Sequence, residues 1–159
     1  MIYIHSDSPT PGQFDWNRFE FVNGILSYAR VENYRQLGSN SWHPDNFTIS
    51  HSILGNVGGY AIGVSEGTAL IEHNTLFNAA HELIYICFGS QAIIRNNHIG
   101  PNPVEQGISI CADPTAAPHV YNNVIEGNKW GVRFTTPPVA PVFEGNVFIN
   151  NEVDWHHHY

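Results

Sequence analysis

Basic side chains and long apolar runs are scarce in this chain of 159 residues. It has one lysine and five arginines against 14 acidic residues, and its formal net charge at pH 7 is −8. Because nucleic-acid binding needs a stripe of positive charge, we expect no nucleic-acid partner. The same charge balance disfavours tight binding of an anionic glycan unless a cation bridges the two. No run of about 18 apolar residues occurs, so the sequence predicts no membrane-spanning helix.

A short phrase recurs along the chain: an apolar residue, two residues, Asn, one residue and a second apolar residue. Its clear copies place four residues at the same point, which we call the ladder position: Asn74, Asn97, Asn123 and Asn146. Two weaker copies have Ala29 and Ser52 there. The successive intervals between these six positions are 23, 22, 23, 26 and 23, and such regularity is the mark of a structural repeat.

A second apolar segment lies between successive ladder positions: Ala61-Ile62-Gly63-Val64, Leu83-Ile84-Tyr85-Ile86, Gly107-Ile108-Ser109-Ile110 and Gly131-Val132-Arg133-Phe134. Each repeat therefore contains two or three short strands separated by Gly, Asn and Pro, with no room for a helix of about ten residues. A strand periodicity and a repeat of this length predict an all-β solenoid in which each repeat makes one turn.

Stacking of the turns explains the Asn and the apolar residues around it. Turns lie about 4.8 Å apart, so a column of buried Asn can pass amide hydrogen bonds from turn to turn. Asn also tolerates the left-handed backbone conformation that we expect at a tight bend. The residues three before and two after the ladder position are expected to stack into a core: Leu26, Ile49, Ile71, Ile94, Val120, Phe143 and Val31, Leu54, Leu76, Ile99, Ile125, Phe148.

These phrases resemble the parallel β-helix repeats of the right-handed, pectate-lyase-like superfamily over roughly residues 19–155. The resemblance implies a right-handed, single-stranded parallel β-helix of about six turns, with an irregular lead-in or N-terminal cap at 1–18 and the β-helix domain at 19–159. The superfamily contains polysaccharide lyases, glycoside hydrolases, epimerases, tailspikes, adhesins and periplasmic proteins, so it does not select one activity.

The resemblance also implies an extracellular, cell-surface or periplasmic location. Residues 1–5 lack the basic start and apolar centre of a signal peptide. If the natural protein is secreted, we expect this chain to be a mature form or an excised piece.

In enzymes of this kind the substrate lies along the outer face of one strand column. The outward positions here are predicted to be Glu20, Gly63, Tyr85, Ser109, Arg133 and Asp154. Arg133 beside Asp154, with His156 nearby, could neutralise a glycan carboxylate and help to remove a proton, while Tyr85 could donate to the leaving oxygen. The alternative is a structural surface ion pair, because the column has neither three acidic residues to hold Ca²⁺ nor a pair of Asp at hydrolase spacing.

Two further columns lie one and two residues before the ladder position. His51 and His73 occupy adjacent turns and could hold a divalent metal ion, although a stacked polar column is the alternative. A divalent cation is the one cofactor that these residues suggest. One position earlier, Glu72 and Arg95 are predicted to form an ion pair between turns.

Aromatic residues are numerous for a thin solenoid, and several are expected to face outward. We select as candidate sugar-stacking residues Trp42, Tyr34, Tyr121 and Trp130. Exposed planar rings also seal protein interfaces, so the rings by themselves do not separate a glycan from a protein partner.

Two other features concern the turns. Cys87 and Cys111 take the same place in successive turns, at a separation that a disulfide allows, but reduced thiols acting as small core residues are the favoured interpretation. Residues 32–44 and 100–105 show little strand periodicity and are predicted to be loops.

Three functions are compatible with this pattern. The first is a non-catalytic module that binds polysaccharide, and the second is a structural subunit that associates with itself or another subunit through its uncapped ends. The third is a lyase, hydrolase or epimerase acting on a polysaccharide. Binding ranks first and catalysis last, because the constellation that an enzyme of this fold needs is missing.

Overall fold

The computed structural model describes residues 1–4, 10, 16–20, 23–38, 46–111, 115–135 and 141–158, with Trp16 described by its backbone alone. Trp42, a candidate sugar-stacking residue, lies outside the described residues. All regular elements in these ranges are strands, and none of the described segments forms a helix that could cross a bilayer.

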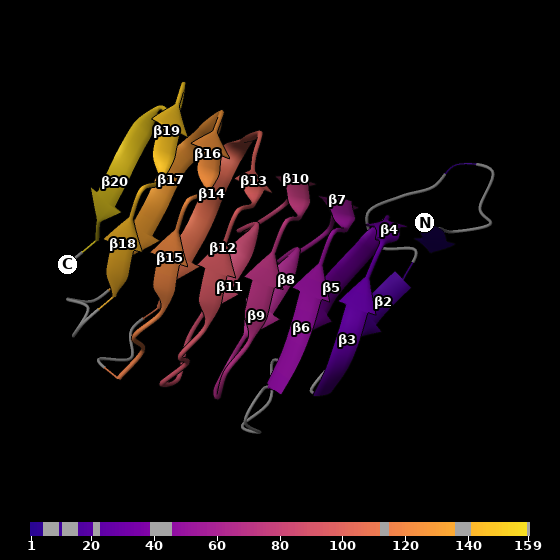
Figure 1. The fold of residues 1–159 in the computed structure, drawn as a ribbon. Helices are drawn as coiled ribbons and strands as arrows, with labels where there is room; N and C mark the ends of the chain where they lie inside the picture. The colour runs from indigo at the N-terminus through magenta and orange to yellow at the C-terminus, as the bar shows by residue number, and fades with distance from the viewer. Residues whose placement is uncertain are drawn as a thin grey trace.

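The strands form three parallel sheets that run along the length of a coil (Figure 1). The first sheet contains β1 (Ile2–Ile4), β4 (Ala29–Glu32), β7 (Ile53–Val57), β10 (Thr75–Ala79), β13 (His98–Ile99), β16 (Val124–Glu126) and β19 (Val147–Ile149). The second contains β2 (Trp16–Phe19), β5 (Tyr34–Gly38), β8 (Ile62–Val64), β11 (Ile84–Ile86), β14 (Asn102–Ile110), β17 (Asn128–Phe134) and β20 (Val153–His157). The third contains β3 (Asn23–Ser27), β6 (Asn46–Ser50), β9 (Leu70–Glu72), β12 (Ile93–Arg95), β15 (His119–Tyr121) and β18 (Val142–Glu144).

Three consecutive strands make one turn, one strand for each sheet. The turns β3–β5, β6–β8, β9–β11, β12–β14, β15–β17 and β18–β20 follow one another from the indigo end of the coil to its yellow end (Figure 1). The predicted all-β solenoid of about six turns is therefore confirmed.

The core is built from the two apolar columns that flank the ladder position. In the third sheet Ile71 is aligned with Ile49 on one side and Ile94 on the other. In the first sheet Leu76 is aligned in the same way with Leu54 and Ile99. All six of these side chains are fully buried, so each turn completes its core only against its neighbours.

The ladder residues lie inside the coil and are joined by hydrogen bonds. The Asn97 Oδ1 atom accepts from the backbone N–H of Asn74 at 2.9 Å and from its Nδ2 at 3.1 Å. The same two bonds link Asn97 to Asn123, and Asn123 to Asn146. Ser52 extends the column, because its backbone N–H donates to Asn74 Oδ1 at 3.0 Å.

The left-handed backbone conformation lies one residue earlier than expected. Positive φ angles between 51° and 55° occur at the residues just before the ladder position: Tyr28, His51, His73, Asn96 and Asn122. These bend residues are exposed, whereas the ladder residues that follow them are buried. Adjacent residues therefore have different roles. The first turns the chain through its positive φ angle, and the second forms the hydrogen bonds inside the coil.

A second set of buried amides lies at the next bend and was not predicted. Asn128 donates from its backbone N–H and its Nδ2 to Asn151 Oδ1, at 3.0 Å in both bonds. One turn earlier, Asn102 Oδ1 accepts from the backbone N–H of Ala79 at 3.2 Å. These residues stand five positions after ladder residues 97, 123 and 146, so the repeat contains the signal for them.

Both predicted loops are partly wrong. Residues 34–38 form β5. Tyr34 and Leu37 are buried in the core and Gln36 is buried as well, so the strand does not alternate between apolar and polar residues. Residues 102–105 belong to β14, which accommodates extra residues through a shift of register between Asn102 and Gln106. Residues 39–45 lie outside the described part of the chain.

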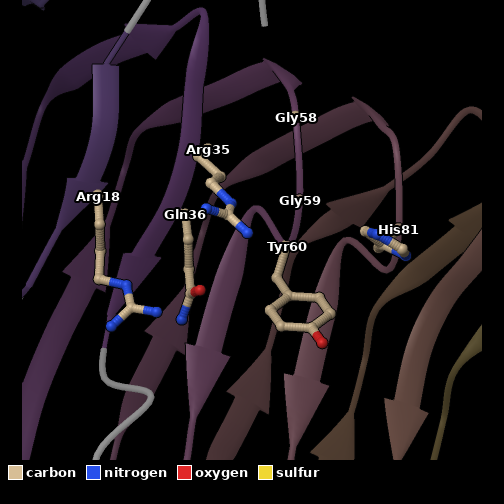
Figure 2. Close-up of a pocket in the computed structure, with 7 residues that line it drawn as sticks. All are labelled: Arg18, Arg35, Gln36, Gly58, Gly59, Tyr60 and His81. Carbon is tan, nitrogen blue, oxygen red and sulfur yellow. The ribbon is translucent and has the colours of Figure 1, made fainter. Parts of the chain in front are cut away.

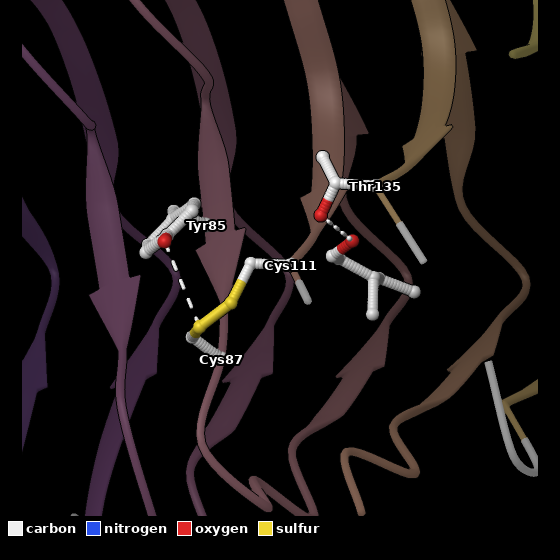
Figure 3. The surroundings of a disulfide bond; sticks show 5 residues. Tyr85, Cys87, Cys111 and Thr135 are labelled. Carbon is white, nitrogen blue, oxygen red and sulfur yellow. Dashed lines mark hydrogen bonds between the residues drawn. A yellow bond between two sulfur atoms is a disulfide. The ribbon is translucent and has the colours of Figure 1, made fainter. Parts of the chain in front are cut away.

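The favoured interpretation of two reduced thiols is also wrong. Cys87 and Cys111 are joined by a disulfide, and their Cα atoms lie 5.0 Å apart (Figure 3). The bond forms because the two residues directly follow the paired strands β11 and β14. It fastens two successive turns beside the outer face of the second sheet, where the Tyr85 hydroxyl lies 3.6 Å from Cys87 Sγ.

Candidate functional site

The outer face of the second sheet carries the column that was predicted to hold catalytic residues. Backbone pairing aligns Tyr85 with Gly63 and Ser109, and Arg133 with Ser109 and His156. Tyr85 and Arg133 are half-buried on this face, whereas Ser109 between them is buried. The structure thus places Tyr85 and Arg133 in one column, with the turn that carries Ser109 between them.

The predicted pairing of Arg133 with Asp154 is corrected by the register. Arg133 is aligned with His156, which follows it by one full repeat interval, whereas Asp154 falls two places short of that interval. The Asp154 carboxylate accepts a hydrogen bond from Asn151 Nδ2 at 3.0 Å. Asp154 therefore acts with the bend that precedes β20 and not with Arg133.

Trp130 is the centre of a cationic and aromatic cluster at this end of the sheet. Its ring stacks on that of His156, with centroids 4.4 Å apart and an interplanar angle of 7°. Lys129 Nζ lies 4.6 Å and Arg133 Cζ 5.4 Å from the Trp130 ring centroid, within the range of cation–π attraction. Desolvation and the neighbouring charge of Arg133 lower the pKa of His156.

The other candidate sugar-stacking residues do not join Trp130. Tyr34 is completely buried in the core and its hydroxyl donates to the Ala61 carbonyl at 3.1 Å, so its expected outward position is corrected. Tyr121 is half-buried on the third sheet, where its hydroxyl accepts from Arg95 Nη1 at 3.0 Å. Of the described candidates, the structure therefore keeps Trp130 alone on the outer face of the second sheet.

A pocket of about 310 Å³ lies at the other end of the same sheet (Figure 2). Its lining residues come from β2, from β5 and from the segments before β8 and β11: Arg18, Arg35, Gln36, Gly58, Gly59, Tyr60 and His81. The Tyr60 ring stacks on Tyr85, with centroids 4.5 Å apart and an interplanar angle of 9°. The pocket is thus continuous with the predicted column.

Comparison with protein families agrees with this geometry. A family model described as a right-handed beta helix region matches residues 37–158. The chain belongs to the right-handed β-helix family. No significant match was found among curated proteins or solved structures. Membership confirms the handedness of the fold and leaves the activity to the residues of the site.

This β-helix also carries an acidic pair that the sequence analysis missed. Glu82 is 8% exposed and its Oε2 has no hydrogen-bond partner within the described ranges. Glu105 follows it by one repeat interval, and the Leu83 N–H bonds the Gln106 carbonyl at 3.1 Å, so the two Glu residues lie in adjacent turns. Burial raises the pKa of Glu82, and the charge of Glu105 raises it further. The repeat interval is the signal that would have found this pair.

The two histidines suggested as metal ligands lie on a corner of the β-helix. The rings of His51 and His73 stack with centroids 4.9 Å apart and an interplanar angle of 17°, and Tyr28 stacks on His51 at 4.9 Å. Parallel rings present their nitrogens side by side and not toward one shared point. Across the described segments no group of three or more His, Cys, Asp or Glu could hold a metal ion. Metal binding stays a prediction, which calorimetric titration with Cu²⁺ or Zn²⁺ tests.

The predicted ion pair between turns is present in the β-helix. Arg95 Nη2 lies 2.7 Å from Glu72 Oε2, on strands β12 and β9. Hydrogen bonds to Tyr121 and Glu72 raise the pKa of Arg95. The arrangement holds three adjacent turns of the third sheet together, which is a structural role.

Proposed function

We propose that this β-helix is a non-catalytic module that binds polysaccharide along the outer face of its second sheet. The observation that carries the proposal is that stacked rings gather at two places on that face, Tyr60 with Tyr85 and Trp130 with His156. Strands β11 and β17 are two positions apart in the sheet, or about 10 Å, so one extended ligand can contact both. Planar rings with polar edges suit the faces of sugars.

An extracellular, cell-surface or periplasmic location belongs to the same proposal. The disulfide between Cys87 and Cys111 supports it, because disulfides persist mainly in oxidising compartments. Expression in a reducing and in an oxidising compartment, followed by thiol alkylation, compares how the bond forms in each.

Binding to an array of neutral and acidic polysaccharides tests the proposed function. We expect at least one class to bind, and Trp130→Ala to weaken that binding about tenfold by removing a stacking surface. Tyr28→Ala is the matched control, because Tyr28 is an exposed aromatic residue at a corner away from the second sheet. If a folded protein binds no glycan on the array, the proposal is wrong.

Catalysis is a second candidate because of the acidic pair. Burial raises the pKa of Glu82, and a carboxyl with a raised pKa suits a general acid. Burial also raises the pKa of the nearby Tyr85, and the charges of Tyr60 and Glu82 raise it further. Incubation with neutral and uronic-acid polysaccharides, with and without Ca²⁺, followed by mass spectrometry, separates this candidate from binding. Shortened products that disappear in Glu82→Gln would favour an enzyme.

Self-association is a third candidate. Large apolar side chains are exposed on the first and last described turns, among them Ile25 on β3 and Trp155 on β20. Light scattering over a range of protein concentrations tests it, and a monomer at every concentration would contradict it.

A further inference from the structure

We infer that the pocket lined by Arg18, Arg35, Gln36, Tyr60 and His81 is a subsite for an anionic group carried by the bound glycan. The inference rests on the proposed function, because it names the chemical class of glycan that the same face would prefer. Its basis is that the lining of this pocket combines one buried amide donor, two guanidinium groups and one aromatic ring.

Gln36 supplies the buried donor. Its side chain is only 5% exposed, lines the pocket and has no described hydrogen-bond partner for its Nε2. A buried amide donor without an acceptor is unfavourable, and most such groups in folded proteins are paired. An oxygen of a ligand in this pocket would supply the missing acceptor.

Arg18 and Arg35 supply the positive charge. Arg18 on β2 is aligned with Gln36 on β5, and Figure 2 shows their side chains side by side, with the Arg35 guanidinium between Gln36 and Tyr60. Within the described ranges neither guanidinium forms an ion pair, although Arg30 and Arg95 both do. Guanidinium groups bind carboxylate and sulfate oxygens through parallel N–H donors, and the amide adds a further donor.

Nearby charges, and not the net charge of the protein, determine the electrostatic potential in the pocket. Salt screens interactions between exposed charges beyond about 8 Å at physiological ionic strength, so distant carboxylates weigh little here. Burial raises the pKa of Tyr60, the charge of Glu82 raises it further and that of Arg35 lowers it, so both charged groups are near the ring. Arg18 and Arg35 line the pocket and Glu82 does not, so an anion in the pocket lies closer to the two guanidinium groups than the net charge of −8 would suggest.

Tyr60 explains why the anion is expected on a sugar. Its half-buried ring lines the pocket beside the guanidinium groups and continues through the stacked Tyr85 to the column on the second sheet. A sugar ring can lie against Tyr60 while its charged substituent reaches Arg35 and Gln36. A free inorganic anion would use the cations but not the ring.

Calorimetry with matched oligosaccharides tests the inference. The probes are a uronic-acid oligomer, the same oligomer with its carboxyl groups reduced to alcohols, and that neutral oligomer carrying sulfate esters. We expect one of the two charged oligomers to bind at least about tenfold more tightly than the neutral one. The charged oligomer with the higher affinity relative to the neutral one shows whether the pocket prefers a carboxylate or a sulfate.

Variants locate the preference. Arg18→Gln combined with Arg35→Gln should remove the gain of the charged oligomer, so that the charged and neutral oligomers bind the variant equally well. Arg30→Gln combined with Arg95→Gln is the matched control, because it removes two charges from other sheets. Equal binding of charged and neutral oligomers, or the same loss in the control, would overturn the inference while the proposed function stands. If none of the three oligomers binds to the folded protein, the inference is overturned, and binding to the polysaccharide array then decides the proposed function.

Discussion

Tyr60 and Tyr85 stack face to face on the outside of the coil, with ring centroids 4.5 Å apart. Gly63 is aligned with Tyr85 in the neighbouring strand and contributes no side chain there. Burial raises the pKa of both phenols, so both remain neutral donors at physiological pH. The pair therefore joins the pocket to the outward column of the second sheet.

The Tyr85 ring, and not its hydroxyl, is expected to carry glycan binding. Tyr85→Ala should weaken binding about tenfold, whereas Tyr85→Phe keeps the stacked ring and should stay close to the wild type. Affinities from isothermal titration calorimetry compare the two. Equal loss in both variants would show that the hydroxyl, which contacts Cys87, is the more important part.

The ladder is expected to be a major source of stability. Asn97 donates to the Ile71 carbonyl and Asn123 Oδ1 and accepts from two groups of Asn74. Asn97→Ala leaves buried partners unsatisfied and should lower the free energy of unfolding by about 2–4 kcal/mol. Urea denaturation measures the change.

The neighbouring bend residue provides the control for the ladder variant. Asn96 is exposed with φ of 55°, so Asn96→Gly removes a side chain at a position that glycine adopts readily. We expect little or no loss of stability. A loss as large as that of Asn97→Ala would contradict the division of tasks between bend and ladder.

The disulfide is expected to stabilise the coil by restricting the unfolded chain. Cys87 and Cys111 are 24 residues apart, and a loop of this size corresponds to about 3 kcal/mol. Thermal unfolding with and without reductant measures the loss. Thiol titration of the denatured, unreduced protein should find no free thiol, and two thiols would show that the bond does not form.

The buried Glu82 should make stability depend on pH. Its pKa is raised above the usual 4.5, so the folded state holds the proton more tightly than the unfolded state. Stability should therefore fall as pH rises from 4.5 toward the pKa of the folded protein, and stay low above it. Glu82→Gln should flatten this dependence and unfold at higher urea concentration near neutral pH.

The exposed Glu152 is a suitable control for the pH experiment. Glu152→Gln should leave the pH dependence of the urea midpoint as in the wild type. If Glu82→Gln has the same pH dependence of the urea midpoint as the wild type, burial of Glu82 does not couple its protonation to stability.

Several structural features followed directly from the repeat. The repeat interval aligns Ile71 with Ile94 and Glu72 with Arg95, because equivalent residues of successive turns must stack one strand spacing apart. The same rule locates Asn151 beside Asn128 and places Glu105 in the turn next to that of Glu82, so these could have been predicted from the same counting. Asp154 was misplaced because it falls short of a full interval after Arg133, whereas His156 completes that interval.

The sequence by itself determined the coil, its core columns and the Asn ladder, since these depend on one period repeated many times. Only the tertiary structure decided which aromatic rings face outward. Tyr34 enters the core while Tyr60 lies outside against Tyr85, and both stand where the local pattern is irregular. The pocket likewise required the structure, because Arg18, Gln36 and His81 come from three different turns. Their meeting depends on how each bend directs its side chains, and a one-dimensional period does not encode that direction.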